Sequence, residues 1–190
     1  MPVEFLSDGQ VAAYGCFVGS PSRAEVARFF YLDDSDRELI ARRRSDPHRL
    51  GFPVQLGTVR AVGRFLEDPL LVPWAAVEFL AKQLGIEDPS CVKQYVHRPQ
   101  TAYEHAWEIR EVYGYRPFED RDSAEEFARL LTGRVWTQAE GPVAVFDQAV
   151  AWLRRHRVLL PGVSVLARQV ASARESAETR LHALLAEAAS

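Results

Sequence analysis

Residues 78–98, EFLAKQLGIEDPSCVKQYVHR, contain the pattern of two short helices joined by a tight turn. Small Ala81 would lie where the two helices touch, and Gly85 supplies the positive φ that the turn requires. Apolar Val92 and Tyr95 would anchor the second helix to a core. The stretch therefore predicts a helix-turn-helix, although the same spacing also occurs in plain helical hairpins.

The free face of this second helix would present polar and basic side chains. Such side chains reach phosphates and the base edges of a major groove. The candidate DNA-binding residues here are Ser90, Lys93, Gln94 and, just beyond the helix, His97 and Arg98.

A second hairpin pattern precedes the first and lies in a basic block. Residues 42–64 contain six arginines against the single acid Asp46, a local balance of +5. Phosphate and base contacts could then come from adjacent elements. In the competing interpretation, the arginines at 42–44 only compensate a helix dipole and Gln55 is an ordinary surface residue. The candidates are Arg42, Arg43, Arg44, His48, Arg49, Gln55 and Arg60.

A second basic block follows near the carboxyl end. No acid lies between Asp147 and Glu175, and five arginines fall in residues 154–174. The formal net charge is only −3, because 26 acids offset 23 basic residues, but those acids cluster elsewhere in the chain. From this block we take Arg154, Arg155 and Arg157 as candidates, with Arg157 and the arginines at 42–44 expected to contact phosphates.

Helix start signals recur along the chain, and no strand alternation competes with them. Capping boxes are indicated at Ser7, Ser22 and Ser123, and several prolines suit first-turn positions. The sequence therefore predicts an all-α protein with two or three small helix-turn-helix-like subdomains. Pro53 would lie inside a helix over 47–64, which must be kinked there or begin there. The expected helices span 7–14, 21–31, 35–44, 47–64, 73–84, 89–96, 101–113, 123–134, 142–157 and 163–188.

The segment EDPLLVP at 67–73 places two prolines between helical patterns. We expect it to be the linker between a first DNA-binding subdomain, residues 1–68, and a second one, residues 69–190, which ends in a connecting helix.

The sequence offers little for catalysis or metal binding. The five histidines form no HExxH motif, and no glycine-rich phosphate loop is present. His105 and Glu108 could share a helical face as metal ligands of a small hydrolase, but a surface pair is the simpler interpretation. Two distant cysteines argue against disulfides and zinc fingers. We expect no catalytic residue, metal or cofactor, and a soluble cytoplasmic chain without a membrane span.

Six motifs follow one another along the chain: PVEFLS (2–7), ARRR (41–44), RLGF (49–52), VQLGTVR (54–60), YEHAWEIR (103–110) and RVLLPG (157–162). In this order they resemble the amino-terminal region of Tn3-family replicative transposases. The resemblance spans 1–174 and implies binding of double-stranded DNA at terminal inverted repeats, self-association through the rest of the transposase, and a place in the bacterial cytoplasm at the nucleoid. It also implies that the catalytic acidic triad lies elsewhere, so this chain alone would not be an enzyme. Pro53 departs from the expected pattern.

The alternative function is a helical protein-interaction or dimerisation module. Apolar residues at near-heptad spacing run from Leu166 to Leu184 and could form a seam with a partner chain. The four tryptophans are expected in the core rather than on a base-stacking surface.

Overall fold

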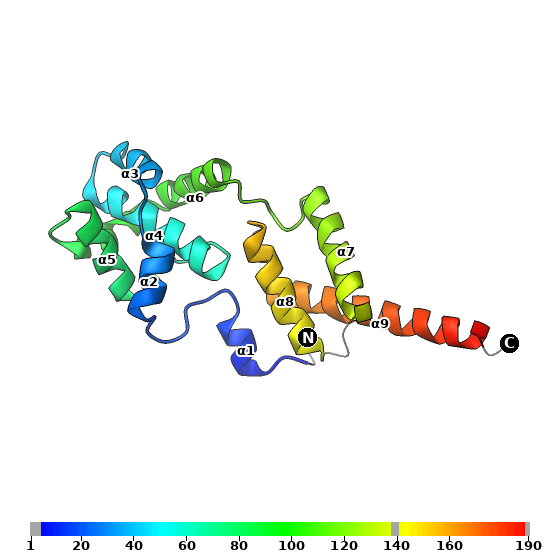
Figure 1. Ribbon diagram of the computed structural model, residues 1–190. Coiled ribbons are helices and arrows are strands. Elements are labelled where there is room, and N and C mark those ends of the chain that lie inside the picture. The colour runs from blue at the N-terminus through cyan, green and yellow to red at the C-terminus, as the bar shows by residue number, and fades with distance from the viewer. Residues whose placement is uncertain (1–4, 138–140, 189–190) are drawn as a thin grey trace. The chain divides into compact units, whose positions relative to one another are not determined.

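The computed structural model describes residues 5–137 and 141–188, and every regular element within these ranges is a helix (Figure 1). The prediction of an all-α fold is confirmed. The elements are α1 (Asp8–Ala13), α2 (Arg23–Phe30), α3 (Asp34–Ala41), α4 (Asp46–Val62), α5 (Trp74–Leu84), the 3₁₀-helix η1 (Pro89–His97), α6 (Pro99–Tyr113), α7 (Arg121–Thr137), α8 (Pro142–Arg155) and α9 (Val163–Ala188).

The chain forms two compact units. One is continuous and comprises Gly15–Tyr115; we call it the continuous unit. The other combines Met1–Tyr14 with Arg116–Ser190 and is called the two-segment unit. The continuous unit is thus an insertion between the two segments of its neighbour.

Helix α4 is the centre of the continuous unit, where α2, α3, α5, α6 and η1 pack around it (Figure 1). Every residue from Leu50 to Val59 is buried, so the helix has no solvent face over that length. Two glycines permit the close packing: a Cβ on Gly51 would approach the Tyr95 ring closer than 3.0 Å, and one on Gly57 would do the same to Phe30. The helix begins at Asp46 and continues through Pro53, so it does not begin at the proline.

The proline-bearing stretch at 67–73 is a turn inside the continuous unit. The backbone N–H of Leu71 donates to the carbonyl of Asp68 at 3.1 Å, and that of Leu70 donates to the Asp68 carboxylate at 2.9 Å. Gly63 ends α4, Pro73 precedes the first residue of α5, and the two helices pack on each other across the turn. The compact units therefore divide the chain elsewhere than the predicted boundary between residues 68 and 69.

Local signals position most helix ends as predicted. Ser7 with Gln10 and Ser22 with Glu25 form complete capping boxes. The prediction for Ser123 is wrong: its hydroxyl and backbone N–H both donate to Asp120, which caps α7 one turn earlier.

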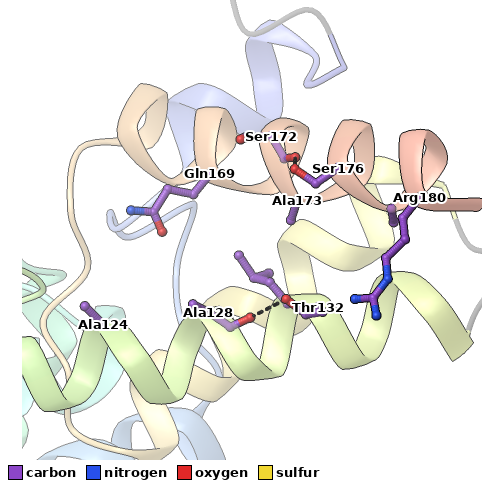
Figure 2. Close-up of a pocket in the computed structure, with 10 residues that line it drawn as sticks. Ala124, Ala128, Thr132, Gln169, Ser172, Ala173, Ser176 and Arg180 are labelled. Atoms are coloured by element: carbon purple, nitrogen blue, oxygen red, sulfur yellow. Dashed lines mark hydrogen bonds between the residues drawn. The ribbon is translucent and has the colours of Figure 1, made fainter. Parts of the chain in front are cut away.

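Helices α7, α8 and α9 form the core of the two-segment unit together with Tyr14 from the first segment. The Tyr14 hydroxyl donates to the carbonyl of Pro161 at 3.0 Å, and its ring lies 5.6 Å from that of Phe146. Between α7 and α9 the facing residues are mostly small, and they leave a groove of about 420 Å³ into which the Arg180 side chain extends (Figure 2).

Candidate nucleic-acid interface

The element expected to read DNA is held in place by its two buried residues. Asp88 caps η1 by accepting from the backbone N–H of Ser90 at 2.9 Å, and hydrogen bonds from Ser90 lower the pKa of the Asp88 carboxyl. Val92 and Tyr95 point into the core, as predicted. Gly85 ends α5 with a φ of 65°, also as predicted.

The second element of this hairpin is a 3₁₀-helix and not the expected α-helix. Its two buried residues, Val92 and Tyr95, lie three positions apart, which is the period of a 3₁₀-helix. At about 2 Å rise per residue, side chains three positions apart stand about 6 Å apart along one edge. All five predicted residues are exposed: Ser90, Lys93, Gln94, His97 and Arg98.

The three arginines that follow α3 have different environments. Arg42 and Arg44 are exposed. The Arg43 side chain is only 7% exposed, because its guanidinium forms an ion pair with Glu108 and lies 3.9 Å from the centre of the Phe52 ring. Arg43 therefore ties α3 to α4 and α6, and the prediction of a solvent-facing phosphate contact is not met for it.

Gln55 was expected on the surface and is instead buried at 4% exposure. Its amide donates to the Tyr95 hydroxyl at 2.6 Å and to the Ala102 carbonyl at 2.8 Å. The Tyr95 hydroxyl lies 2.9 Å from Nδ1 of His105, to which it can donate. Burial, with the nearby Arg43 charge, lowers the pKa of His105 to about 4, so its ring is neutral at pH 7. The apolar surroundings of α4 explain why this polar side chain joins a core network.

Arg60 and its neighbours on α4 also serve the fold. Arg60 holds the buried Asp36 carboxylate through two hydrogen bonds of 2.9 and 3.0 Å, and the Tyr113 hydroxyl donates to the same carboxylate at 2.5 Å. Arg49 pairs with Asp46 at 2.8 Å and is partly buried. His48 is also partly buried, with its ring 6.1 Å from that of Tyr95, which brings the start of α4 beside η1.

The second basic block begins in the last turn of α8, in the two-segment unit. Arg154, Arg155 and Arg157 are exposed, and His156 between them stacks on Trp152 with ring centres 4.1 Å apart. Arg157 has a φ of 54°.

Several large aromatic side chains are exposed to solvent, which the sequence did not predict. Trp74 and Trp107 are each 45% exposed, so the expectation that they belong to the core is wrong. Trp107 donates its indole N–H to the Tyr103 hydroxyl at 2.9 Å, and both rings lie on the outside of α6. The i, i+4 spacing of these rings among Glu104, Glu108 and Glu111 could have indicated a solvated face.

His105 and Glu108 are not placed to bind a metal ion together, as the hydrolase alternative requires. His105 is buried against Tyr95, and Glu108 is paired with Arg43. Among the described residues there is no group of three or more side chains placed to bind a metal ion. No helix in the described ranges is long and apolar enough to cross a bilayer.

The sequence matches a known protein family over most of its length. The chain is a member of the family described as "Domain of unknown function (DUF4158)", whose model matches residues 5–173.

The relatives that this chain resembles are transposases, as the resemblance implied. The chain is 41% identical over 186 residues to the transposase for transposon gamma-delta of Escherichia coli (strain K12), covering 98% of this chain and 19% of that protein. It is 34% identical over 166 residues to the transposase for transposon Tn501 of Pseudomonas aeruginosa, and 28% over 156 residues to that for transposon Tn1546 of Enterococcus faecium. These matches cover 87% and 82% of this chain and 16% of each relative. The chain thus spans about a fifth or less of the length of these relatives.

Proposed function

We propose that this chain binds double-stranded DNA as the end-recognition part of a Tn3-family transposase and reads the terminal inverted repeats of its transposon in the bacterial cytoplasm. The observation that carries the proposal is its similarity, over 98% of its length, to a transposase. The exposed basic side chains support it.

Of the residues predicted to contact DNA, we retain as candidates those that are exposed to solvent. On η1, Gln94 and Lys93 are the best candidates for base or groove contacts, because buried Val92 and Tyr95 hold the helix from below. Arg42 and Arg44 are candidates for phosphate contacts, as are the three arginines that end α8. Gln55, Arg43 and Arg60 are assigned to the fold instead.

A gel-shift titration tests the proposal with the transposon's own terminal repeat and a scrambled duplex of equal length. We expect a clear preference for the repeat. Gln94→Ala should cost about 1 to 3 kcal/mol on the repeat and much less on scrambled DNA. Gln169→Ala, which removes an exposed glutamine from α9, is the matched control and should change neither. Equal binding of both duplexes by the unaltered chain would contradict end recognition.

One observation favours the second candidate, a protein-interaction module. Leu166 and Val170 pack inside the two-segment unit, but Leu181 and Leu184 on the same helix are exposed. Light scattering of the intact chain and of a Leu181→Ser, Leu184→Ser variant separates the two functions. A dimer that the variant abolishes supports association through α9, and a monomer in both cases excludes it.

A further inference from the structure

Helix α8 ends in a backbone conformation that usually requires glycine. Arg157 follows the C-cap residue His156 and has a φ of 54°, in the left-handed region. The N–H of Val158 donates to the carbonyl of Leu153 at 2.9 Å, and the N–H of Arg157 donates to that of Arg154 at 3.2 Å. These two hydrogen bonds define a Schellman motif.

The same chain uses glycine at comparable positions. Helices α4, α5 and α6 end on Gly63, Gly85 and Gly114, with φ of 80°, 65° and 68°. Among the described residues, Arg157 is the only non-glycine with positive φ. A Cβ in this conformation crowds the following carbonyl oxygen, so arginine at 157 is less stable than glycine would be.

The surrounding structure fixes this conformation. The backbone N–H of Arg116 donates to the carbonyl of Arg157 at 2.8 Å, and the N–H of Leu159 donates back to the carbonyl of Arg116 at 2.9 Å. Val158 and Leu153 on either side of the turn are buried in the core. These contacts hold the backbone of residue 157 in place, so the strain at its positive φ cannot be relieved by a shift of the turn.

Compensation of the helix dipole does not account for an arginine here. Arg154 and Arg155 already place two cations in the last turn of α8, and the dipole effect fades beyond that turn. We propose that Arg157 holds its strained position to place a guanidinium against a DNA backbone phosphate, which its planar donors can bind through paired hydrogen bonds. This inference rests on the proposed function and adds that stability and DNA binding oppose each other at one residue.

The test is Arg157→Gly in the intact chain, with melting temperature and the salt dependence of binding as separate readouts. We expect the melting temperature of the two-segment unit to rise by about 4 to 8 °C, because the strain is relieved. The slope of log affinity against log salt on a random-sequence DNA duplex should fall by about 0.9, because one phosphate contact is lost.

Three control variants separate strain from charge. Arg155→Ala removes a cation from the same turn without relieving strain, so its melting temperature should not rise. Arg157→Lys keeps both charge and strain, and should leave the salt slope near that of the unaltered chain. Gly114→Ala adds a Cβ at a left-handed position where no other atom lies within 4 Å. The fall in its melting temperature therefore measures the cost of a Cβ at positive φ in this protein.

A more stable Arg157→Gly chain with an unchanged salt slope overturns the phosphate role, and a less stable one overturns the strain argument. If the unaltered chain shifts no duplex at all, the proposed function fails before any variant is compared. A rise in stability together with a lower slope supports the inference.

Discussion

Replacing Gly51 by alanine should loosen the support of η1. In an open helix this change stabilises by about 1 kcal/mol, since alanine has the higher helix propensity. Here the new Cβ would lie closer than 3.0 Å to three ring atoms of Tyr95, a fully buried side chain. Overpacking of this kind costs about 1 to 3 kcal/mol. Displacing the Tyr95 hydroxyl also weakens its hydrogen bonds to Gln55 and His105, at about 1 kcal/mol each.

The net expectation is a loss of about 3 kcal/mol, or about 12 to 24 °C in the melting temperature of the continuous unit, measured by calorimetry. Gly133→Ala is the matched control, because Gly133 is an exposed residue of α7 with no atom within 4 Å of a built Cβ. It should stabilise by about 0.5 to 1 kcal/mol. A Gly51→Ala chain as stable as the control variant would refute the argument that close packing requires this glycine.

The remaining predictions concern two polar networks and the unit boundaries. The pKa of His105 is about 4 in the folded chain against 6.5 for a free histidine, so the unfolded state binds more protons between these values. Stability should therefore be complete above pH 6.5 and fall by about 3 kcal/mol as the pH drops toward 4; urea titrations over this range should show the loss, and His105→Phe should reduce it. Asp36→Ala removes the buried acceptor of Arg60 and Tyr113, and we expect a loss of about 3 kcal/mol in urea denaturation, with Asp34→Ala, an exposed neighbour, as control. Residues 15–115 should give a cooperative thermal transition when expressed alone, whereas residues 1–68 should not, because that cut separates α4 from α5, η1 and α6; a cooperative transition in 1–68 would contradict the unit assignment.

Local signals in the sequence predicted most of the helices and their starts. Ser7 and Ser22 cap their helices through contacts within one turn, which a sequence displays directly. The capping of α7 was misassigned because Asp120 and Ser123 are both good caps, and tertiary packing buries Ser123.

Contacts between distant segments explain what the sequence could not show about the candidate site. The sequence predicted the exposed polar face of η1 correctly, because the two buried residues that define the opposite face, Val92 and Tyr95, lie in the same short element. The partners of Gln55 and Arg60 lie 40 and 24 positions away. No local pattern reveals that such a helix is surrounded on all sides. Likewise, a proline-bearing turn and a linker have the same composition, and only the packing of α4 on α5 distinguishes them.

The insertion of one unit into the other sets an order of events during synthesis. Tyr14 must wait for Pro161, its hydrogen-bond acceptor 147 positions later. At roughly 5 to 20 residues per second on a ribosome, that interval is about 7 to 30 seconds. The continuous unit is complete once Tyr115 has emerged, so it can fold while the first segment still lacks its partner. Helix α1, although made before the continuous unit, would therefore find its place after that unit has folded.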